Sequence, residues 1–302
     1  MYFRYNVEKG VRELKTIGFI GTGVMGKSMA GHLMKAGHSV HVYTRTKEKA
    51  NDLLESGAKW AETPKEIAKN CDVIITMVGY PTDVEEVYLG TDGLIEHAKE
   101  GSYLIDMTTS SPQLAQKIEK AAAEKHLAAL DAPVSGGDIG ARDAKLSIMV
   151  GGEESAFKEL LPIFSKMGTN VVYQGKAGSG QHTKMCNQIA IASGMIGVCE
   201  AILYAEKAGL NPETVLKSIE SGAAGSWNLS NLGPRMLKGD FAPGFYVKHF
   251  IKDMTIALNS AEEMGLMTPG LSLAKKLYEE LAEMGEEDSG THALYKRLAN
   301  QG

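Results

Sequence analysis

The stretch Gly21-Thr22-Gly23-Val24-Met25-Gly26 decides the fold of this chain. It follows a short apolar segment at 16–20 and opens a helical pattern at 24–36, which stops at Gly37. A second apolar segment follows at 39–43. Glycines at this spacing between a strand and a helix predict a turn whose backbone approaches a pyrophosphate at the helix N-terminus. The predicted nucleotide-binding residues here are Gly21, Thr22, Gly23, Val24 and Met25.

The alternation of strand and helix patterns continues beyond this first unit. A helix is predicted at 47–56 and another at 111–125, and strands are predicted at 72–78, 103–106, 127–131, 146–150 and 171–173. Strands that alternate with helices of this length are typical of a parallel sheet with helices on both faces. The sequence therefore predicts an α/β fold with a Rossmann-type, doubly wound, mainly parallel sheet.

The pattern changes near Gly178, after which only helices are predicted. They span 180–208, 212–221, 228–237, 248–264, 269–284 and 289–300. We therefore expect a dinucleotide-binding domain at 1–178, with a short polar N-terminal tail, and an all-helical domain at 179–302. A length of 302 residues suits two domains.

Composition excludes several classes of protein. Hydrophobic residues make up 43% of the chain and charged residues 23%, which is typical of a globular protein and not of a disordered one. The net charge of -5 argues against a nucleic-acid binder. The run 185–199 has no charge but is shorter than the about 20 residues of a membrane span, so a buried helix is expected.

Cysteine and histidine usage points to a cytoplasmic protein without a metal. Three cysteines in 302 residues predict neither a disulfide framework nor a zinc site. The histidines show no metal-ligand spacing. The segment 1–15 carries both charge signs and lacks the apolar core of a signal peptide.

The end of the second predicted strand bears on the choice of coenzyme. An acidic residue there would bind the ribose hydroxyl of NAD, but this chain reads Thr44-Arg45-Thr46. A guanidinium pairs well with a phosphate, so Arg45 favours NADP, with NAD as the alternative. Lys47 or Lys49 is a further candidate for the 2′-phosphate. The competing interpretation is a solvated basic start to the next helix.

A lysine at the predicted domain junction is a candidate proton donor. Lys184 enters a helix that carries no further charge until Glu200, and Asn187 and Gln188 follow on the same helical face. A buried lysine is costly unless it is solvated or used. Hydride transfer to a carbonyl needs such a donor beside the oxygen.

Four motifs in order resemble those of the β-hydroxyacid dehydrogenases. They are Gly21–Gly26, Asp131-Ala132-Pro133-Val134-Ser135-Gly136-Gly137, the Gly178-x-Gly-x-x-x-Lys184 segment and Lys252-Asp253, and the resemblance covers 16–298. It implies reversible hydride transfer between NADP(H) and a small 2- or 3-hydroxy acid, or its oxo acid or semialdehyde. It also implies a homodimer or homotetramer.

The resemblance implies a role for each matching residue. Lys184 corresponds to the catalytic lysine. The residues implied to contact the carboxylate substrate are Ser135, Gly136, Gly137, Asn187, Gln188, Phe245 and Asp253. The residues implied to contact the coenzyme are Val78, Gly79, Asp83, Thr109 and Lys252, beside Thr44, Arg45 and Thr46.

The chain departs from the family pattern at two points. Gln188 stands where many members have asparagine, and at this place the chain resembles the tartronate semialdehyde reductases. Gly79 stands where a proline is usual. By contrast, the segment from Phe245 to His249 looks more like the glyoxylate/succinic semialdehyde reductases. The substrate is therefore left open.

Several alternatives stay open at this point. Lys248 and Lys252 would also suit a solvated helix face, and Phe245 would suit the core. His182 and His249 are rival acid/base groups, and Trp227 either walls the cleft or packs. Two other functions compete: a non-catalytic NADP-binding or sensing module, and a decarboxylating sugar-acid phosphate dehydrogenase.

Overall fold

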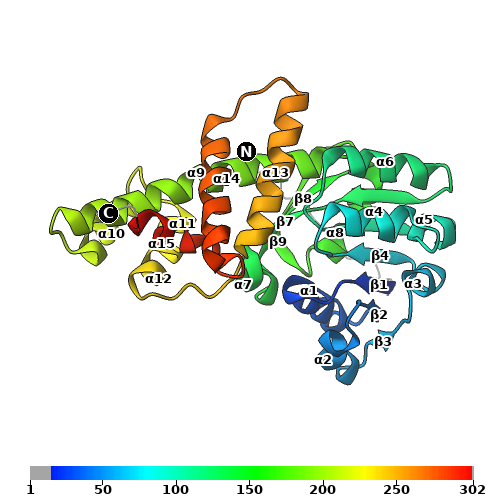
Figure 1. The fold of residues 1–302 in the computed structure, drawn as a ribbon. Helices are drawn as coiled ribbons and strands as arrows, with labels where there is room; N and C mark the ends of the chain where they lie inside the picture. The colour runs from blue at the N-terminus through cyan, green and yellow to red at the C-terminus, as the bar shows by residue number, and fades with distance from the viewer. Residues whose placement is uncertain (1–14, 301–302) are drawn as a thin grey trace.

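The computed structural model describes residues 15–300. The predicted polar tail at 1–15 therefore lies outside the described residues, apart from Lys15. Figure 1 shows two parts that meet along α9 (Ser179–Lys207): a sheet flanked by helices, and a group of helices that pack around α9. This arrangement confirms the predicted α/β fold followed by a helical region.

The sheet of the first part is mainly parallel, as predicted. Among residues 15–300, nine strands form it in the order β3-β2-β1-β4-β5-β6-β8-β7, with β9 beside β8. The β8 strand runs antiparallel to β6 and β7, and the other pairs are parallel. The bounds are β1 Thr16–Ile20, β2 Ser39–Tyr43, β3 Lys59–Trp60, β4 Val73–Thr76, β5 Tyr103–Asp106, β6 Ala128–Asp131, β7 Val134–Ser135, β8 Leu146–Gly151 and β9 Gly168–Gly175.

Helices cover both faces of this sheet because the parallel strands are apolar on both sides. On one face Met29 of α1 and Leu160 of α8 join the core, and on the other Tyr88 of α4 and Ile118 of α6 do so. The helices are α1 Val24–Lys35, α2 Asn51–Glu55, α3 Pro64–Asn70, α4 Pro81–Leu89, α5 Leu94–His97, α6 Pro112–Ala123, α7 Gly137–Arg142 and α8 Glu154–Phe164.

The second part is built on α9, whose 29 residues span about 44 Å. Its inner face packs through Met195 and Ile202 against Phe250 of α13 and Leu271 of α14. The remaining helices are α10 Pro212–Ile219, α11 Trp227–Asn231, α12 Gly233–Leu237, α13 Val247–Glu263, α14 Pro269–Leu281 and α15 Leu294–Ala299. Gly178, the predicted domain boundary, lies between the end of β9 and the start of α9. The division into two domains at this residue stays a prediction.

The structure corrects some predicted elements. The helix predicted at 228–237 is two short helices, because a continuous helix would set the ring of Pro234 against a backbone carbonyl one turn earlier. The helix predicted at 269–284 leaves α geometry after Leu281, where the chain makes a π-turn that contains Gly285 at φ +86°. The helix predicted at 289–300 starts as a 3₁₀ turn, Thr291–Ala293.

The α9 helix meets the length and hydropathy criteria for a membrane span, which core helices of soluble proteins also meet. About 39% of its most apolar window is buried within the described residues. Its inner face packs on the core, whereas part of its outer face is exposed. The absence of a membrane partner stays a prediction.

Candidate active site

One cavity of about 1960 Å³ lies where the carboxyl edge of the sheet meets α9 and α13. The residues that the motifs and the family resemblance assign to the coenzyme and the substrate all line it, including the glycine turn and Phe245. Ligands of open α/β sheets bind at this edge, where the strand order reverses. The structure therefore brings the predicted residues together, and their roles stay proposals.

The glycine turn after β1 is shaped to admit a ligand. A Cβ at Gly21, whose φ is +95°, would clash with the Met77 carbonyl, and one at Gly26 would clash with the Gly21 carbonyl. A Cβ at Gly23 would meet nothing within 4 Å, so the space above this residue is open. The Thr22 hydroxyl is buried and has no partner within residues 15–300. Open space above a helix N-terminus fits a pyrophosphate.

The end of β2 presents a cation to the same cavity. Arg45 is 78% exposed, and its guanidinium lies 3.1 Å from Asp83 Oδ1. Asp83 Oδ2 accepts a hydrogen bond from the Tyr80 backbone N–H (3.1 Å), which fixes the start of α4. Lys49 also lines the cavity, whereas the Lys47 ammonium lies over the Trp60 ring. Of the three candidate cations for a 2′-phosphate, Arg45 and Lys49 therefore line the cavity.

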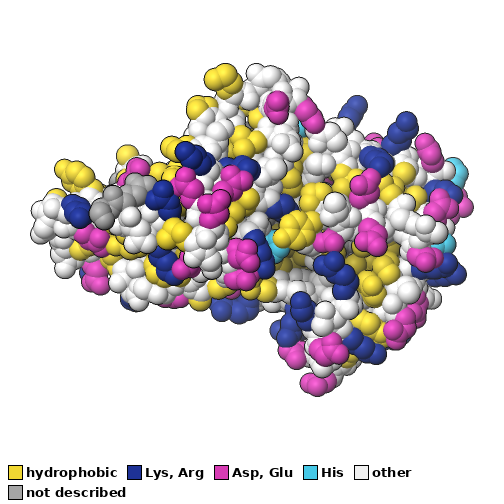
Figure 2. Space-filling model, viewed as in Figure 1, with side chains coloured by type: hydrophobic (Ala, Val, Ile, Leu, Met, Phe, Trp, Pro, Cys, Tyr) yellow, Lys and Arg dark blue, Asp and Glu magenta, His cyan; other side chains and the backbone are white. Residues whose placement is uncertain are grey.

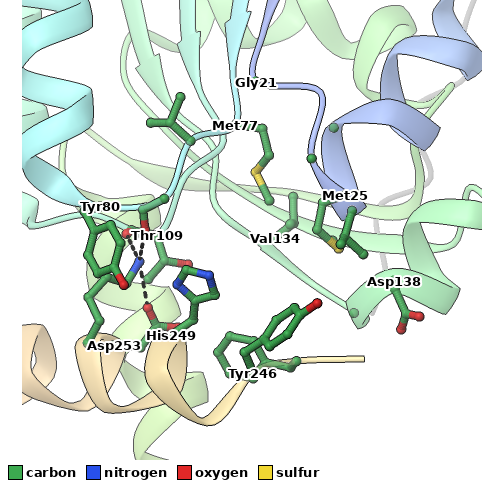
Figure 3. Close-up of a pocket in the computed structure, with 18 of the residues that line it drawn as sticks. Gly21, Met25, Met77, Tyr80, Thr109, Val134, Asp138, Tyr246, His249 and Asp253 are labelled. Carbon is green, nitrogen blue, oxygen red and sulfur yellow. Dashed lines mark hydrogen bonds and ion pairs between the residues drawn. The ribbon is translucent and has the colours of Figure 1, made fainter. Parts of the chain in front are cut away.

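Lys252 connects α13 to the sheet part of the chain. Its Nζ donates to the carbonyls of Thr109 (2.8 Å) and Gly79 (3.2 Å) and forms an ion pair with Asp253 Oδ1 (3.0 Å). Figure 3 shows Thr109 and Tyr80 on one side of the cavity, facing His249 and Asp253 on α13. With only 12% of its side chain exposed, Lys252 does not form part of a solvated helix face.

The turn after β7 offers backbone groups to an anion. Gly136 and Gly137 have φ values of +129° and +63°, a region that favours glycine. Ser135 and both glycines line the cavity. Successive backbone N–H groups beside a hydroxyl form a concave site that suits a carboxylate.

Lys184 lies in the first turns of α9, and its side chain is almost wholly buried. Its Nζ donates to the Val134 carbonyl (2.9 Å), one residue before Ser135. Burial lowers the pKa of Lys184 to about 8, with Asp253 opposing and Lys252 assisting that shift. A lysine with a pKa near neutrality can donate a proton as the ammonium and accept one as the neutral amine.

A chain of hydrogen bonds connects the polar residues after Lys184. Asn187 Nδ2 donates to Gln188 Oε1 (2.7 Å), and Gln188 Nε2 donates to Asp253 Oδ2 (2.6 Å). Gln188 and Asp253 are buried. The hydrogen bonds occupy the amide oxygen and nitrogen of Gln188 and the Oδ2 atom of Asp253, whereas Asp253 Oδ1 faces Lys252. Asn187 is only partly buried, so its amide is the more accessible of the two.

Aromatic side chains form part of the cavity wall. The His249 ring lies between Tyr80 (5.6 Å between ring centroids) and Tyr246 (5.9 Å), and burial lowers the pKa of His249. Trp227 lines the cavity with 58% of its surface exposed, and Phe245 lines it while its ring packs on Phe250. Of the two rival histidines, His249 lines the cavity and His182 does not.

Sequence reasoning missed some cavity residues. Tyr80, Arg235 and His292 line the cavity, but none belongs to a motif. The unusual Gly79-Tyr80-Pro81 loop was the available signal for Tyr80. Arg235 and His292 reach the cavity because of the helix packing, which a local pattern does not reveal.

Known proteins match both parts of the chain. Residues 16–175 match the family model described as the NAD binding domain of 6-phosphogluconate dehydrogenase. Residues 178–298 match the model described as NAD-binding of NADP-dependent 3-hydroxyisobutyrate dehydrogenase.

Individual relatives align over nearly the whole chain. The uncharacterized oxidoreductase YkwC of Bacillus subtilis is 70% identical, over 93% of this chain and 98% of that protein. The probable 3-hydroxyisobutyrate dehydrogenase-like 1 protein of Arabidopsis thaliana is 52% identical, over 93% of this chain and 84% of its own length. The solved structure of Mycobacterium tuberculosis 3-hydroxyisobutyrate dehydrogenase with L-serine superposes with a TM-score of 0.87 at 30% identity, and the match covers 95% of this chain and 99% of that one.

Proposed function

The chain belongs to the β-hydroxyacid dehydrogenase family of NAD(P)-dependent oxidoreductases, and we propose that it transfers a hydride reversibly between NADP(H) and a small hydroxy acid. The substrate is a 2- or 3-hydroxy acid in one direction and its oxo acid or semialdehyde in the other. The observation that carries this proposal is the buried Lys184 ammonium beside the turn Ser135–Gly137, in a cavity that also contains the glycine turn.

The chain's own groups supply binding and proton transfer. Bound nicotinamide supplies or accepts the hydride. The N–H groups and hydroxyl of Ser135–Gly137 hold the substrate carboxylate, and this places the reacting carbon beside Lys184 and Asn187. Lys184 Nζ gives a proton to the carbonyl oxygen in reduction and takes the hydroxyl proton in oxidation. Its positive charge also stabilises the developing alkoxide.

Lys184→Ala tests this proposal. We expect kcat to fall by roughly 10² to 10⁴, the usual contribution of general acid–base catalysis, with little change in the Kd of NADPH. Initial rates of NADPH oxidation are measured with glyoxylate, succinic semialdehyde, tartronate semialdehyde and methylmalonate semialdehyde.

Lys207→Ala is the matched control, because Lys207 is an exposed lysine in the last turn of the same helix. We expect this variant to keep wild-type turnover. Wild-type turnover by Lys184→Ala would refute the role of Lys184.

NADP is proposed over NAD because Arg45 stands where an acid would bind the NAD ribose. The description of the second matching model as NADP-dependent supports this choice. We expect Arg45→Ala to raise the KM for NADPH at least about tenfold and to leave the KM for NADH unchanged, because one charged hydrogen-bonding pair contributes roughly 1.5–3 kcal/mol. An equal rise in both KM values would contradict a contact with the 2′-phosphate.

The two rival functions make different predictions. A sensing module would bind NADP without turnover on any substrate of the panel. A decarboxylating sugar-acid phosphate dehydrogenase needs cations for a phosphate and would release CO₂. Of the cavity cations in the helical part, Arg235 is paired with Asp240 (2.8 Å) and Lys248 with Asp288 (2.6 Å), which argues against that rival.

We also propose that copies of this chain associate through one face of α9. This small-residue face comprises Cys186, Ala190, Ser193, Gly194 and Gly197, all exposed. Glycine inside a helix costs roughly 0.5–1 kcal/mol relative to alanine, and a Cβ at Gly194 or Gly197 would meet nothing within 4 Å. Intramolecular packing therefore does not explain these glycines, whereas close approach of a partner helix does.

The remaining parts of the proposal concern location and other partners. We propose a cytoplasmic enzyme, which its three free cysteines and its charge suit. Within residues 15–300, no three His, Cys, Asp or Glu side chains gather as metal ligands. Independence from metal, nucleic acid and membrane stays a prediction.

A further inference from the structure

We infer that Asp131 is a positioning residue, whose carboxylate fixes the first turn of α9, and through it the Lys184 ammonium, relative to the substrate turn Ser135–Gly137. Asp131 ends β6 and does not line the cavity. The inference rests on the proposed role of Lys184 in proton transfer.

The carboxylate of Asp131 caps α9 from outside the helix. The residue before α9, Gly178, has no side chain that could serve as a cap. Asp131 Oδ1 instead accepts from the Gly178 N–H (2.8 Å), and Oδ2 accepts from the Gln181 N–H (2.8 Å). Asp131 is 3% exposed, so its charge lies buried at the positive end of the helix.

Two glycines permit this close approach. A Cβ at Gly151 would lie 2.6 Å from Asp131 Oδ1, and a Cβ at Gly180 would lie 2.6 Å from the Asp131 carbonyl. Real Cβ atoms do not come so close to an oxygen, so a side chain at either position would push α9 away from β6. The glycine spacing before Lys184 in the sequence thus has a physical cause.

Gln181 provides a second tether. Its side chain is fully buried, and its Nε2 donates to the Thr108 carbonyl (2.7 Å) while its Oε1 accepts from the Ser110 N–H (2.9 Å). Thr108 and Ser110 follow β5, and Asp131 ends the neighbouring β6. The first turn of α9 is therefore held at the ends of two adjacent strands.

These tethers connect directly to the reacting groups. Lys184 lies one turn after Gln181, and its Nζ contacts the carbonyl of Val134, three residues after Asp131. The segment 131–137 is thus joined to α9 at two points and carries the substrate turn at its end. Since a displacement of about 1 Å can lower a rate about 100-fold, the positions of these tethers matter for turnover.

Asp131→Asn is the test, since it keeps the shape but turns an amide nitrogen toward one of the two N–H donors. The kcat is counted per NADPH-binding site, from a coenzyme titration, so that unfolded protein does not contribute. We expect kcat per site to fall at least about tenfold, with the Kd of NADPH within about threefold of wild type. Asn211→Ala is the matched control: it removes a cap from α10, remote from the cavity, and keeps kcat per site.

A double-mutant cycle separates positioning from general structural damage. If Asp131 acts through Lys184, the double variant with Lys184→Ala loses no more kcat per site than Lys184→Ala alone. A further tenfold loss in the double variant, or a kcat per site within about threefold of wild type in Asp131→Asn, would overturn the inference. If Asp131→Asn fails to fold, Gln181→Met takes its place. This variant removes only the hydrogen bonds of the Gln181 side chain, and the same values of kcat per site, alone and with Lys184→Ala, support or overturn the inference. Full turnover by Lys184→Ala would instead defeat the proposed function.

Discussion

At the scale of single residues, the charge of Lys184 is set by groups that act in opposite directions. Burial and the neighbouring Lys252 lower its pKa, to about 8, and Asp253 raises it. Reduction uses the protonated ammonium and oxidation uses the neutral amine. We therefore expect kcat/KM for reduction to be level below pH 8 and to fall above it, and kcat/KM for oxidation to rise through the same pH. Rates in both directions between pH 6 and pH 10 measure this.

Two neighbouring variants move this pH midpoint in opposite directions. Asp253→Asn removes an anion that favours the ammonium, so the midpoint for reduction moves to lower pH. Lys252→Met removes a cation that disfavours the ammonium, so the midpoint moves to higher pH. A midpoint that stays fixed in both variants, or moves the same way in both, would show that another group titrates.

At the scale of elements, motifs that are contiguous in sequence could be predicted well. The glycine turn, the Ser135–Gly137 turn and the helix that carries Lys184 each have a local pattern, and the structure places all three at one cavity. The role of Asp131 could not be predicted in the same way. Its partners, Gly178 and Gln181, lie 47 and 50 residues later, and only the packing of α9 on β6 brings them together.

Short elements were the hardest to predict. The β7 strand has two residues, too few to show a period, and its antiparallel pairing with β8 depends on a chain reversal through α7. The break between α11 and α12 follows from Pro234, a residue that the helical pattern around it obscured. What the sequence left open at this scale therefore lies in elements too short to show a period and in a break within an otherwise helical pattern.

At the scale of the whole molecule, the cavity needs both parts of the chain. The sheet part contributes the glycine turn, Arg45 and the Ser135–Gly137 turn, and the helical part contributes Lys184 and Lys252. Lys252 joins the two through the carbonyls of Gly79 and Thr109. Other parts of the helical region face away from the cavity. Figure 2 shows hydrophobic side chains at the turn between α13 and α14.

The proposed association of two copies can be tested by a substitution on the exposed surface, which leaves the packing within one chain unchanged. Met267 in the α13–α14 turn is 85% exposed and Leu273 of α14 is 51% exposed, and a Cβ at Gly270 of α14 would lie 2.8 Å from Ser193 Oγ on the small-residue face. This apolar surface therefore adjoins α9. Gly197→Glu places a charge within the proposed contact, where a monomer has open space, so we expect the mass to fall to that of one chain.

Light scattering after size-exclusion chromatography measures that mass, and circular dichroism reports whether the helices persist. Ser155→Glu, which adds the same charge on the exposed surface of α8, is the control, and we expect it to keep the wild-type mass. Gly197→Ala adds helix propensity worth up to about 1 kcal/mol, so in the isolated chain it raises the thermal midpoint. If Gly197→Glu keeps the wild-type mass, the copies associate elsewhere or not at all, and the exposed glycines of α9 need another explanation.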